Sequence, residues 1–241
     1  MASEGIYQLL FDYSIAEQRN VPNLPIENQV NALFEHYDPE AADVLLEDLL
    51  YGDLLDDSSP LGPQSQALFL QTLRRSLGTR YLEAEDYNQI GEVVERYSSD
   101  PQALGLLAAL AQDPEPEGER DSLAPLAPIF LDNLTNLSPQ ERISIASFLL
   151  QEGPANNALV NDVLNSQEPL LEILEEQVQL SEEERAAVVR NLEEARQSLR
   201  EIINLTLSFD DQVENQTRAR DMIHRINAVI NRYNGIDELD S

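Results

Sequence analysis

Apolar residues recur at helical spacing over most of this chain of 241 residues. Apolar positions three or four residues apart fall on one face of an amphipathic helix. No stretch of strand length alternates apolar and polar residues, and no Asn-Gly turn joins two β-branched runs. The pattern therefore predicts an all-α fold, and the first half of the chain holds expected helices at 26–37, about 40–52, 64–77, 87–97 and 101–110.

The helix signals continue after residue 121. Leu126, Phe130 and Leu134 have helical spacing, and we expect Pro125 and Pro128 to confine the regular part to the later turns. Ser138-Pro139-Gln140-Glu141 is a capping box with proline at the first helical position, which predicts a helix that continues to Gln151. Two shorter helices are predicted at about 155–165 and 168–179.

Domain organisation is predicted from breaks in these patterns. The acidic stretch 113–121 contains two prolines and a glycine, so it is the best candidate for a linker. It separates an acidic helical region, 1–112, from a middle helical region, 122–180, and a C-terminal hairpin, 181–241. We expect an irregular multi-helix bundle. Helix pairs recur about every 40–45 residues, so a solenoid of stacked pairs is the alternative, although no repeat motif is visible.

The C-terminal hairpin is the best-specified element. Ser181 and Glu184 form a second capping box. An apolar a/d seam follows it and predicts a helix to about residue 208. A second seam runs from Ala219 to Tyr233, so the two helices form an antiparallel pair. Its arginines are expected to pair with nearby glutamates; those involved are Arg196, Arg200, Arg218, Arg220, Arg225, Glu193, Glu194, Glu201 and Glu214.

The hairpin carries more apolar surface than one antiparallel neighbour needs. One interpretation is a self-contained hairpin that packs on the body of the chain. The other is that its second apolar stripe docks another subunit or a partner helix. The residues predicted to contact such a partner are Val189, Ile203, Leu207, Ile223 and Ile230.

The chain contains no lysine. It has 15 arginines against 45 aspartates and glutamates, for a formal net charge of −30. This excludes Schiff-base and phosphate-loop lysines, and the negative field disfavours direct binding to nucleic acid or membranes. Adaptation to high salt, avoidance of lysine modification and compositional drift each account for the missing lysine. The favoured partners are cations or basic protein surfaces.

Candidate chemistry is scarce. Without cysteine there is no disulfide, thiolate metal site or cysteine nucleophile. His36 and His224 do not form a di-iron pattern, the Asp53, Asp56 and Asp57 cluster is not an EF-hand, and the common hydrolase and nucleotide motifs are missing. We therefore predict no catalytic, cofactor or metal site. The N-terminus lacks a signal peptide and no run spans a membrane, which favours the cytoplasm or a particle assembled there.

Three functions fit these observations. The leading hypothesis is a non-enzymatic helical interaction protein: an adaptor, scaffold or assembly subunit of a larger cellular or viral complex. It would self-associate or bind a protein through the hairpin, and its acidic surface would suit high salt. The alternative is a nucleic-acid mimic that occupies a basic DNA-binding groove. A second alternative is an enzyme with an unrecognised carboxylate site.

Overall fold

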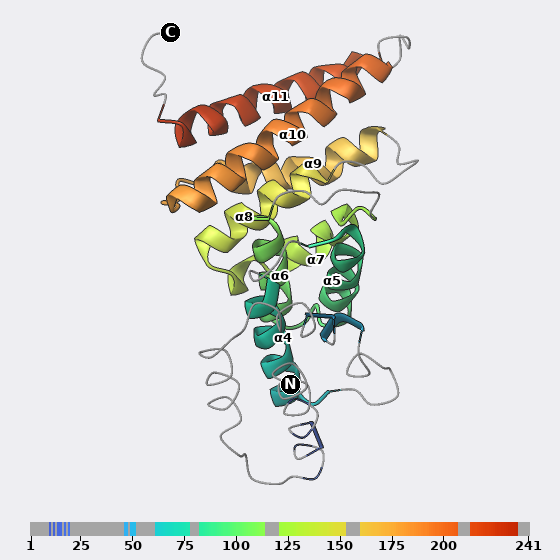
Figure 1. Cartoon of the computed structure of the whole chain (residues 1–241). Helices are drawn as coiled ribbons and strands as arrows, with labels where there is room; N and C mark the ends of the chain where they lie inside the picture. The colour runs from blue at the N-terminus through green and yellow to red at the C-terminus, as the bar shows by residue number, and fades with distance from the viewer. Residues whose placement is uncertain are drawn as a thin grey trace. The chain divides into compact units, whose positions relative to one another are not determined.

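The computed structural model describes residues 61–77, 82–113, 121–152, 160–206 and 213–235, together with residues 10, 12, 14, 15, 17, 19, 46, 47 and 49–51. These residues form helices joined by turns, and none of them lies in a strand (Figure 1), which confirms the all-α prediction. The chain divides into two compact units. One is Met1–Ala109 with Glu115–Arg120, and the other is Leu110–Pro114 with Asp121–Ser241.

Three described helices belong to the first unit, and α6 extends to the point where the second begins. They are α4 (Pro63–Leu77), α5 (Ala84–Arg96) and α6 (Pro101–Leu110), close to the predicted ranges. Apolar residues at helical spacing on these helices are buried, among them Leu68 and Leu73 on α4 and Ile90 and Val94 on α5. The helix predicted at 26–37 lies outside the described residues. Of the range 40–52, the leucines at 46, 49 and 50 are described, and they are helical and buried.

The carboxylate of Glu17, a residue much earlier in the chain, caps the N-terminus of α4. Glu17 accepts hydrogen bonds from the backbone N–H groups of Gln64 and Ser65, at 3.0 and 2.8 Å, and from the Ser65 hydroxyl. The first N–H groups of a helix have no partner within the helix, so an acceptor here stabilises it. Burial would raise the pKa of Glu17, but these three hydrogen bonds together lower it below 4.5. Gly62 makes room for this carboxylate, because a Cβ there would lie 2.5 Å from the Glu17 carboxyl carbon.

We expect the substitution Glu17→Gln to destabilise the first unit by about 1 kcal/mol at pH 7, because an amide offers one acceptor oxygen where the carboxylate offers two. Since the pKa of Glu17 is lowered by folding, this stabilisation is present above pH 4.5 and is lost as the pH falls through the lower, folded value. Urea titration followed by circular dichroism at pH 7 and pH 3 measures the loss of stability and its dependence on pH. Glu95→Gln, at an exposed site on α5, is the control, and an equal loss in both variants would contradict the cap.

The described part of the second unit begins with three short helices. They are η2 (Ala124–Leu126), α7 (Ala127–Asp132) and η3 (Leu134–Asn136). The regular turns lie earlier than predicted, because Pro128 sits in the first turn of α7, where a missing N–H costs nothing. The predicted capping box is confirmed: Ser138 Oγ accepts from the Glu141 N–H, and α8 spans Pro139–Gln151.

The prediction of two short helices at 155–165 and 168–179 is wrong for the described residues. A single helix, α9 (Val160–Leu174), continues through Pro169. An internal proline removes one backbone hydrogen bond and bends a helix, so propensity favours a break at this point. Here tertiary packing overrides it, because Leu164, Leu170 and Leu171 are buried on both sides of the proline.

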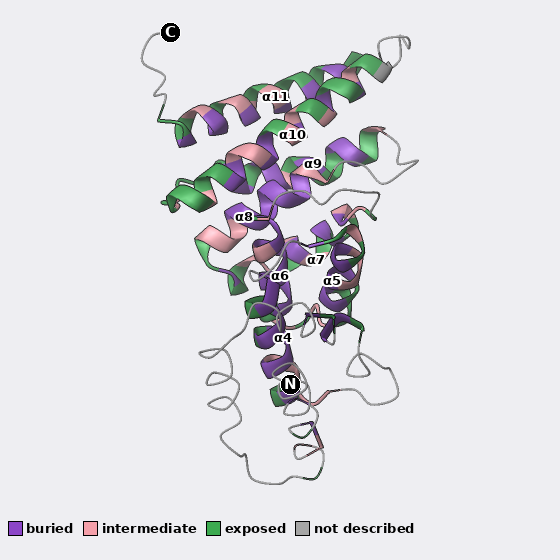
Figure 2. Ribbon diagram, viewed as in Figure 1, coloured by how far each residue is buried: buried purple, intermediate pink, exposed green. Residues whose placement is uncertain are grey.

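The C-terminal hairpin is present as α10 (Glu182–Thr206) and α11 (Val213–Tyr233), which run in opposite directions (Figure 1). The Ser181 and Glu184 capping box is confirmed by reciprocal bonds of 2.8 and 3.2 Å. Gly235 follows α11 with φ of 69°, the left-handed conformation that ends many helices. Both predicted seams are buried (Figure 2); their residues are Val188, Leu192, Ala195, Leu199, Ile202, Ala219, Met222, Ile226, Val229 and Tyr233.

The two helix pairs of this unit stack on each other. α8 packs against α9 and α10, while α11 packs against α9 and α10. Glu168 on α9 pairs with Arg218, and Glu175, the residue after α9, pairs with Arg225 further along α11, so these two helices run parallel. Hairpins stacked in the same direction are the arrangement of α-solenoids. Within the second unit, two helix pairs are stacked in this way, and residues of both the predicted middle region and the predicted hairpin belong to this unit.

Candidate interaction site

The extra apolar surface of α10 has a neighbour within the chain. α10 packs against α8 as well as α11, so one hairpin partner does not account for its buried face. Of the residues predicted to contact a partner, Val189, Ile203 and Ile223 are half-buried. Ile230 is 5% exposed and forms part of the core, and Leu207 lies outside the described residues. The surface left for a partner is therefore narrower than the predicted stripe.

Three arginines spaced seven residues apart join α11 to α9. Arg218 bonds Asn161, Asn165 and Glu168 at 2.9–3.0 Å. Two turns further along, Arg225 bonds Glu175 at 2.5 Å. The third, Arg232, donates to the backbone carbonyls of residues 175 and 176 at 3.2 and 3.3 Å, at the end of α9. We call these three residues the arginine row. It holds the two hairpins in register.

The arginine row corrects the expected pairing within the hairpin. Arg218 pairs with Glu168 on α9 and Arg225 pairs with Glu175 just after α9, so both partners lie outside the hairpin. Arg196 pairs with Glu193 within the hairpin, at 3.8 Å, as predicted. The hydrogen bond from Arg225 is the main cause that lowers the pKa of Glu175. The spacing of seven residues was visible in the sequence, but the partner helix was not.

Arg190 and Asn191 hold the segment 111–113 against α10. Arg190 Nη2 donates to the carbonyl oxygens of Ala111 and Asp113 at 3.1 and 2.8 Å. Asn191 is 1% exposed, and its Nδ2 donates to the Ala111 carbonyl at 3.2 Å and to Ser147 Oγ at 3.3 Å. These bonds satisfy carbonyls beyond the end of α6. We call this set the 111–113 clamp.

The Asp113 carboxyl is unusual within this clamp. Burial raises its pKa from 3.8 to about 6, and the Arg190 guanidinium works in the opposite direction. The folded protein therefore prefers the neutral acid between pH 4 and 6. Stability from this group is fully present below pH 3.8 and is lost as the pH rises through 6.

We expect Asp113→Asn to stabilise the second unit at pH 7.5 by on the order of 1 kcal/mol, after solvent screening is taken into account. The amide removes a partly desolvated charge and leaves the backbone carbonyls of the clamp in place. Near pH 4 the variant and the parent should have equal free energies of unfolding, which urea titration at both pH values measures. Asp132→Asn, at an exposed site, is the control. A variant less stable at pH 7.5 would show that attraction to Arg190 outweighs burial.

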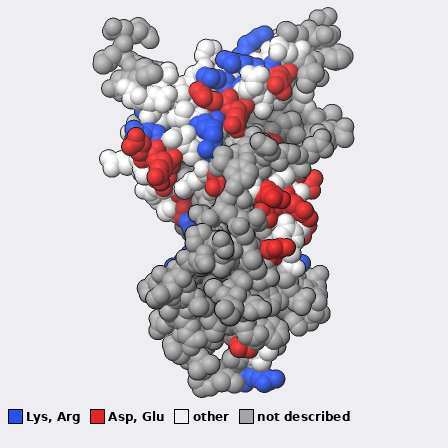
Figure 3. Space-filling model, viewed as in Figure 1, with Lys and Arg blue, Asp and Glu red and all other residues white. Residues whose placement is uncertain are grey.

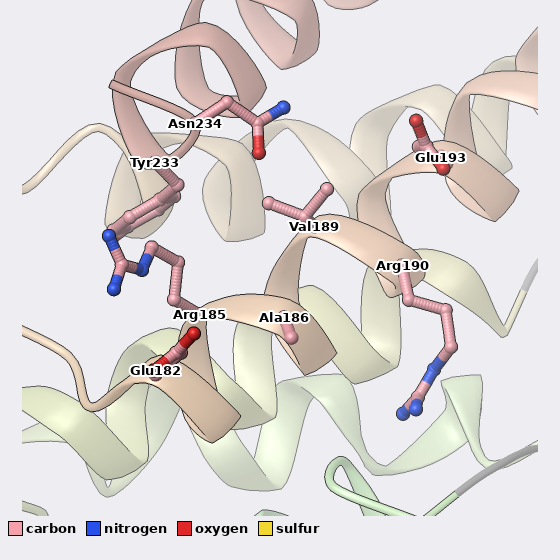
Figure 4. Close-up of a pocket in the computed structure, with 8 residues that line it drawn as sticks. All are labelled: Glu182, Arg185, Ala186, Val189, Arg190, Glu193, Tyr233 and Asn234. Atoms are coloured by element: carbon pink, nitrogen blue, oxygen red, sulfur yellow. The ribbon is translucent and has the colours of Figure 1, made fainter.

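A depression of about 500 Å³ lies between the first turns of α10 and the end of α11 (Figure 4). Its apolar part is formed by Ala186, Val189 and Tyr233. Its polar part consists of Asn234 and four charged side chains, Glu182, Arg185, Arg190 and Glu193. Val189 is the one residue of the predicted stripe that lines it. The depression is thus locally neutral on a strongly acidic chain.

Two side chains in the depression have unused hydrogen-bonding capacity. The exposed Arg185 side chain makes no hydrogen bond or ion pair with the residues that the structure describes. Tyr233 is 7% exposed, and its buried hydroxyl has no hydrogen-bond partner there either. Burial raises the pKa of Tyr233, so the hydroxyl stays protonated and remains a donor. Sequence reasoning assigned Tyr233 to the core and missed its hydroxyl.

Other candidate chemistry does not gather in the described part of the chain. No group of three or more His, Asp or Glu side chains there could hold a metal ion. His224 is exposed on α11, while His36 and the Asp53, Asp56 and Asp57 cluster lie outside the described residues. Acidic and basic side chains are interleaved on the visible face of α10 and α11 (Figure 3).

None of the described helices is both long enough and apolar enough to span a bilayer. Comparisons of the chain with protein-family models, with curated proteins and with solved structures gave no match.

Proposed function

We propose that this chain is a non-enzymatic helical interaction subunit, an adaptor or assembly component that binds a protein partner through the face of α10 and α11 around Val189. The observation that supports it is the depression between these helices, where apolar side chains lie beside charged groups. We also propose that the protein acts in the cytoplasm, or inside a particle assembled there.

The stacked helix pairs support this proposal. The buried seams and the arginine row fix the backbones of α10 and α11, so the exposed side chains between them are presented in one geometry. A preformed surface loses little conformational freedom on binding, which favours affinity. Val189 lines the depression, and the other half-buried apolar residues of the predicted stripe, Ile203 and Ile223, lie further along α10 and α11.

Size-exclusion chromatography with light scattering, followed by native pull-down at 0.1 M and 2 M KCl, tests the proposal. We expect either self-association or capture of the same protein in repeated preparations, retained at high salt because apolar contacts are not screened. Val189→Glu should abolish it. Gln197→Glu, which adds the same charge at an exposed position on the same helix, should not. A monomer that captures nothing, or equal binding by both variants, would refute the proposal.

Nucleic-acid mimicry is the second candidate, and the exposed side of α5 favours it. Glu85, Glu92 and Glu95 are all exposed there at helical spacing. Carboxylates in such a row resemble phosphates to a basic groove, and binding of this kind weakens steeply with salt. Loss of the partner at 2 M KCl, together with its loss in the triple Glu→Gln variant at these positions, would favour mimicry over the hairpin.

A further inference from the structure

We propose that residues 160–168, the part of α9 before Pro169, open as a unit while the rest of the helix stays folded, and that Arg218 of α11 holds them closed. We call these residues the α9 latch. The latch is a conformational device of the second unit, and its existence does not depend on the proposed function. Three features support it: the place of Pro169 in the helix, the unequal burial on its two sides, and the set of residues that Arg218 bonds.

Pro169 weakens the helix at the junction of its two parts. Proline has no N–H, so the backbone carbonyl of Asn165 has no donor four residues later. The proline ring also disfavours the α conformation of the residue before it, which is Glu168. The helical backbone is thus least well supported where residues 160–168 join the rest of α9, and this is the point at which the two parts can separate.

The two parts of α9 are buried to different extents. Before the proline, the buried apolar side chains are Val163 and Leu164. The third buried residue there is Gln167, whose Oε1 has no hydrogen-bond partner among the described residues. After the proline, the short stretch 170–174 buries four apolar side chains, those of Leu170, Leu171, Ile173 and Leu174. Local stability follows the apolar surface that a segment buries, so the part before the proline opens more easily.

A single guanidinium, that of Arg218, fastens the latch to α11. Its three acceptors lie about one turn apart, all before the proline; they are Asn161 Oδ1 at 3.0 Å, Asn165 Oδ1 at 2.9 Å and Glu168 Oε2 at 3.0 Å. The other members of the arginine row, Arg225 and Arg232, bond residues 175 and 176, beyond the proline. Arg218 therefore stabilises the closed latch, whereas Arg225 and Arg232 fasten the opposite end of α9.

Native-state hydrogen exchange of the full chain, followed residue by residue by NMR at low urea, tests the proposal. In an α-helix each N–H bonds the carbonyl four residues earlier, so amides 164–168 report on the latch and amides 173–175 on the part after the proline. We expect amides 164–168 to share one protection factor, about tenfold or more below that of amides 173–175 and nearly independent of urea. A common protection factor and urea dependence for both sets would show that α9 opens as one unit and would overturn the proposal.

Three variants complete the test. Arg218→Gln should lower the protection factors of amides 164–168 about tenfold and leave those of amides 173–175 unchanged. The control is Arg220→Gln, because Arg220 is exposed on the same helix and has no hydrogen bond or ion pair with the described residues, so neither set should change. Adding Pro169→Ala to Arg218→Gln supplies the missing N–H and should restore protection of amides 164–168. An equal loss along all of α9 in Arg218→Gln, or no restoration by Pro169→Ala, would contradict the latch.

Discussion

Leu192→Ala should lower the stability of the second unit by about 2–5 kcal/mol. Leu192 is completely buried near the middle of α10, the helix that packs against both α8 and α11. Truncation removes apolar contacts and leaves a cavity that close-packed neighbours fill only in part. For a protein of this size, that loss corresponds to a fall in melting temperature of roughly 4–20 °C.

Circular dichroism during heating and urea titration measure this change. Gln197→Ala, at an exposed position of the same helix, should change the free energy of unfolding by less than about 0.5 kcal/mol. Val189→Ala provides a second comparison, because this half-buried side chain lines the depression and should affect partner binding more than stability. A Leu192→Ala variant as stable as the parent would mean that the two helix pairs do not share a core.

Raising KCl from 0.1 M to 2 M should stabilise the folded chain by several kcal/mol, with a rise in melting temperature on the order of 10 °C. Two unit charges 10 Å apart in water repel by about 0.4 kcal/mol before screening. The Debye length is about 10 Å at 0.1 M and about 3 Å at 1 M, so added salt removes most of this repulsion. With a net charge of −30, many such pairs contribute.

The salt experiment distinguishes self-repulsion from the ion pairs of the arginine row, because added salt has opposite effects on the stability that each predicts. Its ion pairs weaken as salt screens them, so a protein governed by these pairs would melt at a lower temperature in 2 M KCl. A variant with Gln at four exposed glutamates, Glu85, Glu92, Glu95 and Glu182, should show a shallower rise than the parent. A flat or falling melting temperature in the parent would contradict the dominance of self-repulsion.

Local signals in the sequence were sufficient for most helix boundaries. The capping boxes at Ser138 and Ser181 were confirmed because their partners lie three residues away in the same turn. The continuation of α9 through Pro169 could not be predicted from such local signals. It depends on leucines that are buried by other helices, and such tertiary packing outweighs the local preference for a break.

The candidate site was only partly accessible to sequence reasoning. Val189 was predicted to face a partner and lines the depression, but Ile230 is buried because α10 and α11 share their core with another helix pair. The Tyr233 hydroxyl is buried without a hydrogen-bond partner, and a missing bond has no signature in the order of residues. The seven-residue spacing of the arginine row was a signal that could have been found.

The 111–113 clamp ties the two ends of a long stretch of chain together. Its donors, Arg190 and Asn191, belong to the last helix pair, and its acceptors lie 77–80 residues earlier, where the chain leaves α6. In stacked arrays the terminal pair contacts only its neighbour, and such a pair can open by itself. If this pair separates from its neighbour, the clamp opens with it, so a local fluctuation of α10 and α11 also frees the segment 111–113.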